Sequence, residues 1–216
     1  MGGYVGKILR VDLTRGKVAE EGLPGEDALR KYVGGFGLGL KLFYSEFLPG
    51  FSPQDPENPL IFMTGPLTGV PQVPSSSNTT ITTLNADTGF TVGRSHSHGF
   101  WGAKLKFAGY DGLIVTGASE SPVYLWIEDG ESEIRDASKV WGKDTHESED
   151  AVKEEIGNQA ASVAAIGPAG ESLCAGAMIE NDKNHSFSHS GVGAVMGSKK
   201  LCLLYTSPSP RDRTRS

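Results

Sequence analysis

The sequence predicts an α+β fold built from two similar β-rich halves. Short β-branched or apolar segments alternate with helical ones along the chain. A buried strand followed by a Gly-Pro turn occurs twice, at Gly65-Pro66 and at Gly167-Pro168, and a histidine-containing segment and a glycine-headed helix follow each time. This repetition indicates two related halves with one ligand between them.

The first half is predicted to open with a hairpin, a strand over 7–13 followed by a turn and a second strand from Val18. A helix is expected over 26–47, although the glycines at 34, 35, 37 and 39 interrupt it. Such glycines usually permit close approach of another backbone. The half continues with two strands, a helix and a strand, over 59–63, 79–84, 100–108 and 112–117.

The second half is predicted to repeat this order. Its elements are a hairpin over 123–128 and 131–135, a polar helix over 146–156, strands over 162–166 and 175–180, and a helix over 192–199. After Lys200 the composition changes, and residues 201–216 resemble translated sequencing-adapter read-through. We therefore expect one domain over 1–200 and a non-native or disordered tail over 201–216.

Composition excludes several classes of protein. A chain of 216 residues, 38% of them hydrophobic, can bury one sizeable core. The formal charge of -6 argues against nucleic acid as a partner. Cys174 and Cys202 are too few for a disulfide framework or a four-cysteine cluster, which indicates a reducing cytoplasm. No signal peptide or membrane span is visible, so no membrane partner is expected.

Four of the five histidines lie in two short segments, 95–99 and 184–191, which run into glycine and then into a predicted helix. A helix N-terminus offers unpaired N–H groups and a positive dipole end, which favour phosphate. We expect the two segments to lie close together and to share one phosphorylated cofactor. The alternative is that serine, histidine and glycine only fill two polar turns.

Three longer motifs are more specific: GPLTG at 65–69, GFWGAKLKFAGYD at 99–111 and GVGAVMGSKK at 191–200. Together they resemble the N-terminal domain of the tungsten-containing aldehyde ferredoxin oxidoreductases, and the likeness spans residues 4–200. The resemblance implies a pseudo-barrel of two β-rich halves around a helix, on which a tungsten bis-pyranopterin lies. It also implies a magnesium ion that bridges the pterin phosphates, and absent C-terminal domains that supply the ligands of a 4Fe-4S cluster.

The resemblance also places residues of this chain at the family's cofactor contacts. The magnesium-contacting asparagine falls at His96 and a pterin-contacting glycine at His98, while the first-loop arginine falls near Ser77 or Asn78, so its charge is missing. His185 stands where the family often has arginine, and Ser186 offers its main-chain carbonyl to magnesium. The implied cofactor set, with His96 and Ser186 as metal contacts, is Ser77, Asn78, His96, Ser97, His98, Gly99, His185, Ser186, Ser188, His189 and Gly191.

These departures allow two interpretations. Imidazole is a poor magnesium ligand, but protonated imidazole donates well to phosphate. Histidine, serine and backbone donors therefore replace the arginine clamp, or the chain is a divergent paralogue whose cofactor site has changed.

The resemblance implies that the complete enzyme oxidises a small aldehyde to a carboxylic acid, with ferredoxin as electron acceptor, and that the fragment alone is inactive. A homodimer is one assembly compatible with this. The first alternative is a tungstopterin subunit for another low-potential reduction, of the aromatic acyl-CoA reductase type. The second is a non-enzymatic domain whose histidines bind zinc or nickel.

Overall fold

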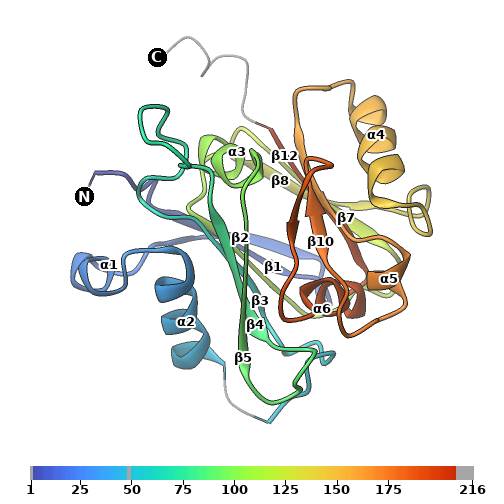
Figure 1. Ribbon diagram of the computed structural model, residues 1–216, viewed down its shortest axis with the longest axis horizontal. Coiled ribbons are helices and arrows are strands. Elements are labelled where there is room, and N and C mark those ends of the chain that lie inside the picture. Colours follow the sequence, from blue (N-terminus) through green and yellow to red (C-terminus); the bar gives the residue numbers. More distant parts are fainter. Residues whose placement is uncertain (1, 48–49, 208–216) are drawn as a thin grey trace.

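The computed structural model describes residues 2–47 and 50–207, and their strands form two six-stranded mixed sheets (Figure 1). The first sheet has the order β2-β1-β6-β3-β4-β5. Its strands are β1 (Lys7–Asp12), β2 (Lys17–Gly22), β3 (Leu60–Met63), β4 (Thr79–Leu84), β5 (Val92–Ser97) and β6 (Gly112–Thr116). β1 and β6 are parallel, and all other neighbours in this sheet are antiparallel.

The second sheet has the order β11-β10-β9-β12-β7-β8. Its strands are β7 (Val123–Glu128), β8 (Glu131–Asp136), β9 (Ser162–Ala165), β10 (Ile179–Asn181), β11 (His185–Phe187) and β12 (Leu201–Ser207). Each sheet starts and ends with an edge strand, so neither closes within the described residues. The predicted pseudo-barrel is therefore not what the structure shows; the architecture is a mixed α/β fold with two open sheets.

The two sheets repeat one connectivity. In each, a hairpin lies beside a parallel strand, and three antiparallel strands follow, so that β1 to β6 correspond in order to β7 to β12. The sequence predicted two similar halves from one repeated turn, and the strand order confirms them. β5 and β11 are consequently equivalent edge strands.

Helices cover the outer faces of the sheets and also contribute to the core that joins them (Figure 1). They are α1 (Glu26–Tyr32), α2 (Gly35–Glu46), α3 (Trp101–Phe107), α4 (Thr145–Ile156), α5 (Pro168–Glu171) and α6 (Val192–Ser198). α2 packs Leu38 and Phe43 on the first sheet, and α4 packs Val152 on the second. Trp101 of α3 and Met196 of α6 join the core shared by both sheets. No helix of the described residues is long and apolar enough to cross a membrane.

Local sequence explains where the helices begin and end. Asp144 caps α4 by accepting a 2.8 Å hydrogen bond from the backbone N–H of Glu147, and Gly157 ends it with φ 74°. The helix predicted over 26–47 is two helices, because the chain turns at Gly34. A Cβ there would lie 2.7 Å from the carbonyl oxygen of Thr64, so only glycine allows the turn after β3 to approach.

The prediction of a disordered tail is wrong for Leu201–Ser207. These residues form β12, which is buried along its whole length and lies between β7 and β9. Without it the second sheet would divide into a hairpin and a three-stranded piece, because no other strand bridges β7 and β9. The apolar run that opens the segment fits such a doubly covered position. Residues 208–216 of the predicted tail lie outside the described residues.

Candidate cofactor-binding site

Part of each histidine segment is an edge strand rather than the loop that the sequence predicted, whereas His98 and His189 lie just beyond these strands. His96 lies on β5 opposite Thr80, and His185 lies on β11 opposite Asn181. Serine, histidine and glycine have low strand propensity, so neither strand was predicted. The signal that could have revealed β5 is its alternation: side chains at 94 and 96 are exposed, whereas those at 95 and 97 are buried.

Hydrogen bonds join the first segment to Asn181 on β10 and directly to the second segment. The Ser97 hydroxyl donates to Oδ1 of Asn181 over 2.6 Å, and Nδ2 of Asn181 donates to the His98 carbonyl over 2.8 Å. The His189 N–H donates to the Ser95 hydroxyl over 3.1 Å. The prediction that the two histidine segments lie close together is therefore confirmed.

Gly99 and His185 meet where these segments converge. Gly99 has φ +84°, and a Cβ on it would lie 2.4 Å from Nδ2 of Asn181, 2.8 Å from Oδ2 of Asp182 and 3.2 Å from Nδ1 of His185. Only glycine fits this position. The same Nδ1 of His185 is buried and has no hydrogen-bond partner in the described residues. Its hydrogen-bonding capacity is therefore unused by the described residues.

The structure does not support phosphate binding by the free N–H groups at the starts of α3 and α6. At the start of α3 the Phe100 N–H donates to Oδ2 of Asp182 over 2.7 Å, so a carboxylate of the protein already lies where phosphate was expected. In the first turn of α6 the Gly193 N–H donates to the Ala177 carbonyl over 2.9 Å. Any anion site must therefore use other donors.

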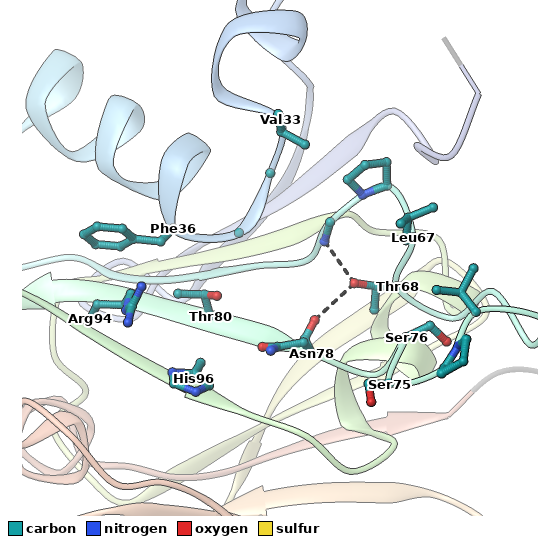
Figure 2. A pocket seen from close by; sticks show the side chains of 16 residues that line it. Val33, Phe36, Leu67, Thr68, Ser75, Ser76, Asn78, Thr80, Arg94 and His96 are labelled. Atoms are coloured by element: carbon teal, nitrogen blue, oxygen red, sulfur yellow. Dashed lines mark hydrogen bonds between the residues drawn. The ribbon is translucent and has the colours of Figure 1, made fainter.

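A pocket of about 600 Å³ lies on the outer face of β4 and β5 (Figure 2). Its walls are the start of α2, the turn over 65–68 and the loop over 73–76. Asn78 and Thr80 contribute from the β4 side, and Arg94 and His96 contribute from β5. The pocket thus combines amide, hydroxyl, imidazole and guanidinium groups, which is a donor-rich lining.

Lys106 anchors the turn that forms one wall of the pocket. Its Nζ donates to the carbonyl oxygens of Gly65 over 2.6 Å and of Gly3 over 2.5 Å, and it lies 3.7 Å from Oδ1 of Asp111. Burial lowers the pKa of Lys106, and the Asp111 carboxylate opposes this shift. The motif over 99–111 therefore shapes the pocket from beneath without lining it.

Arg94 is the pocket residue that sequence reasoning missed. The loss of the family's arginine near Ser77 suggested that the site has no fixed positive charge. The guanidinium of Arg94 restores one, with Cζ 5.5 Å from the centre of the Phe36 ring (Figure 2). Its position two residues before His96 on one strand face is the signal that could have identified it.

The predicted site residues fall into three groups. Asn78 and His96 line the pocket, whereas the neighbouring Ser77 is half-buried outside its lining. Gly191 is explained by packing alone, since a Cβ there would lie 2.0 Å from the Ala175 carbonyl oxygen. The others lie outside the pocket lining, on or beside β5 and β11: Ser97, His98, Gly99, His185, Ser186, Ser188 and His189. Contact of these residues with a cofactor stays a prediction.

The two predicted magnesium contacts lie on the two edge strands. Ser186 pairs with Glu180 in the β10–β11 ladder, and the ring of His96 lies 6.3 Å from that of His98. Among residues 2–47 and 50–207, no three His, Cys, Asp or Glu side chains are grouped to hold a metal ion. A zinc or nickel centre therefore gains no support here. Magnesium bound through main-chain oxygens does not need such a cluster.

Residues 8–206 match the N-terminal domain of aldehyde ferredoxin oxidoreductase. This chain belongs to the aldehyde ferredoxin oxidoreductase family. It is 46% identical over 201 residues to the tungsten-containing aldehyde ferredoxin oxidoreductase of Pyrococcus abyssi, and 45% identical over 211 residues to that of Thermococcus kodakarensis. These alignments cover 93% and 98% of the chain but 33% and 34% of the two relatives. The chain thus spans about a third of their length.

Two further proteins similar to this chain carry names that refer to other compounds. The aliphatic sulfonate oxidoreductase WOR-like subunit of Pyrococcus furiosus is 40% identical over 214 residues, covering 92% of this chain and 33% of that protein. The solved active-site complex BamBC of benzoyl coenzyme A reductase with 1,5-dienoyl-CoA superimposes with a TM-score of 0.91 and 37% identity. That match covers 95% of this chain and 31% of the solved chain.

Tungsten-containing relatives imply a tungstopterin cofactor, and the residues at this site fit such a group. Nδ1 of His185 is buried and has no hydrogen-bond partner among the described residues, and a guanidinium and an imidazole line the pocket on β5. Gly99 keeps the junction between the two segments free of a side chain. These donors suit a group that carries phosphate.

Proposed function

We propose that this chain is the cofactor-binding N-terminal domain of a tungsten enzyme that oxidises a small aldehyde to a carboxylic acid with ferredoxin as electron acceptor. The observation that carries the proposal is the family match over 8–206, together with identity near 45% to aldehyde-oxidising relatives. The meeting of β5 and β11 beside a donor-rich pocket supports it from the geometry.

The part of this chain is to bind and orient the cofactor. When bound, the tungstopterin supplies two-electron redox chemistry at tungsten. The first half donates hydrogen bonds to the cofactor from Asn78, His96 and the neighbouring backbone. The second half donates from His185. His96, and Ser186 through its main-chain carbonyl, would hold the magnesium ion. Because hydrogen bonds join β5 to β10 and to the segment after β11, the two halves hold their donors in one fixed arrangement.

Electron transfer depends on residues beyond this chain. Its two cysteines are Cys174, which is exposed, and Cys202, which is buried, so they cannot provide four thiolate ligands. We propose that C-terminal domains supply the 4Fe-4S cluster and the rest of the cavity, and that the enzyme acts in the cytoplasm. A homodimer is the assembly we propose.

A second candidate is a low-potential reduction on a coenzyme A thioester. The structural match to benzoyl coenzyme A reductase, with a TM-score of 0.91, favours it. Substrate choice lies outside the described residues, so both candidates use the same cofactor domain.

The decisive experiment is expression of the complete gene in a tungsten-supplied host. The proposal predicts tungsten in the purified enzyme, a downstream Cys-x-x-Cys-x-x-x-Cys segment, and aldehyde-dependent reduction of ferredoxin. Reaction with an aromatic acyl-CoA but not with any aldehyde would replace the first candidate by the second. Purified enzyme that contains neither tungsten nor pterin would contradict both.

A further inference from the structure

Arg94 differs from the other arginines of the described residues, because it forms no ion pair. The others each lie within 4.0 Å of a carboxylate oxygen: Arg10, Arg15, Arg30 and Arg135. Arg94 contacts only the Phe36 ring through its guanidinium, at 5.5 Å. A cation without an internal counter-ion, in the wall of a pocket, is available to an anionic ligand.

Its surroundings favour an anion with several acceptor oxygens. The side chain is exposed on the pocket face of β5, two residues from His96, and Thr80, Ser76 and Asn78 lie around the same pocket (Figure 2). The start of the twelve-residue helix α2 also contributes to the wall, and its dipole adds to the positive potential. None of the sixteen residues that line the pocket is acidic.

Arg94 also lies near the position of the family arginine that is missing from this sequence. The family's first-loop arginine falls near Ser77, and Ser76 and Asn78, on either side of Ser77, line the pocket that Arg94 enters. A guanidinium on β5 can therefore reach the same space as one on the loop before β4. Phe36 holds it there by a cation–π contact, which reduces the side-chain entropy lost when a ligand binds.

We propose that Arg94 binds a phosphate group of the pterin cofactor and so replaces the missing first-loop arginine. This inference rests on the proposed function. The planar guanidinium donates two parallel N–H bonds to two phosphate oxygens, a geometry that histidine and serine cannot supply. Phe36 acts as a positioning residue for Arg94.

The test uses inorganic pyrophosphate as the probe and isothermal titration of the 216-residue chain at low ionic strength. Arg94→Gln is expected to weaken binding at least tenfold, because a charge-assisted bidentate contact is lost. Arg135→Gln is the matched control: Arg135 also stacks on a ring, that of Trp126 at 4.2 Å, and loses the same charge away from the pocket. Its affinity should equal that of the unmutated chain.

Arg94→Lys keeps the charge but loses the planar pair of N–H donors. It is therefore expected to weaken pyrophosphate binding about threefold or more. It decides the question if Arg94→Gln does not fold. Absence of pyrophosphate binding by the unmutated chain, or equal affinity of either Arg94 variant, would overturn the inference.

A second readout separates this inference from the proposed function. Pterin released from the purified complete enzyme is measured by its fluorescence. If the unmutated enzyme contains no pterin, the proposed function fails. If it contains pterin and the Arg94→Gln enzyme contains as much per protein, the proposed function stands and the role of Arg94 is wrong.

Discussion

Ser97 donates a 2.6 Å hydrogen bond to the side chain of Asn181, which lies 84 residues further along the chain. Asn181 is fully buried and uses its amide nitrogen to hold the His98 carbonyl at 2.8 Å. One asparagine thus ties the end of β5 to β10, the strand that pairs with β11. The spacing of the two histidine segments depends on this side chain.

Asn181→Leu should lower the free energy of unfolding by about 3 kcal/mol, because it leaves the Ser97 hydroxyl and the His98 carbonyl unpaired in the interior. Urea unfolding followed by circular dichroism measures the change. Asn184→Ala, at an exposed position in the same segment, is the control and should change stability by less than about 0.5 kcal/mol. Equal losses in the two variants would contradict the linking role of Asn181.

Gly102→Ala should prevent folding or cost at least about 3 kcal/mol, because the new Cβ would lie 1.6 Å from Oγ1 of the buried Thr79. Adding Thr79→Ala should restore part of the stability, since that oxygen has no hydrogen-bond partner to lose in the described residues. Thermal unfolding reports both effects. Gly22→Ala, with no atom within 4 Å of the added Cβ, serves as the control. Failure of the Thr79 change to rescue would show that the clash is not the cause.

Lys199 should make the protein more stable as pH rises from 8 to 9. Its Nζ is fully buried against the carbonyls of Pro56 and Gly117, and burial lowers its pKa to about 8, opposed by Glu57. Between that value and the 10.5 of an unfolded lysine, the unfolded chain binds more protons, so the free energy of unfolding increases by up to about 1.4 kcal/mol per pH unit. Urea midpoints between pH 7.5 and 9 measure this slope.

Lys199→Met should remove that rise, because the side chain no longer titrates. The range stops at pH 9 because burial also raises the pKa of Cys202 to about 12, which lowers stability above the pKa of an unfolded cysteine, 9.0. If the free energy of unfolding rises equally with pH in Lys199→Met and in the unmutated chain, other groups cause the rise.

His185→Ala should reduce tungsten content in the completed enzyme more than His146→Ala. In the part of the chain that the structure describes, Nδ1 of His185 is buried without a partner at the junction of the two segments. His146, by contrast, is half exposed and contacts Glu180 at 3.3 Å and the Lys183 carbonyl at 3.1 Å. Loss of one charge-assisted hydrogen bond corresponds to about a tenfold to hundredfold change in affinity. The measurement is tungsten per purified protein. Equal tungsten content in the two variants would show that His185 has no role in cofactor retention.

The purified 216-residue chain should show no aldehyde-dependent dye reduction, because it spans about a third of its relatives and carries only two cysteines. The complete enzyme, assayed in parallel with the same dye, is the positive control. Measurable turnover by the chain alone would place the redox centre within these residues.

Periodicity and turn residues predicted most of the fold. The hairpins, β4 and the helices at Trp101 and Val192 were predicted within one or two residues, because β-branched runs and glycine turns determine them locally. β5 and β11 were missed, because pairing in the two sheets overrides the low propensity of serine and histidine. β12 was missed because the unusual composition after Lys200 concealed a short apolar strand.

The candidate site was predicted in outline only. The sequence located the histidine segments, and the expectation that they share one phosphorylated cofactor placed them close together. It did not reveal Arg94, whose importance comes from the Phe36 ring on a distant helix. It also gave no sign that the Asp182 carboxylate binds the N–H at the start of α3, because that contact depends on tertiary packing.

The repeated strand order determines when each sheet can form during synthesis. In both halves the strand that joins the hairpin to the remaining strands comes last, β6 in the first half and β12 in the second. The first sheet is therefore complete in sequence once Thr116 has left the ribosome, whereas β7 and β8 must wait for Leu201–Ser207. A ribosome that pauses between these points would hold one finished sheet beside an unpaired hairpin, whose exposed edge is a template for aggregation.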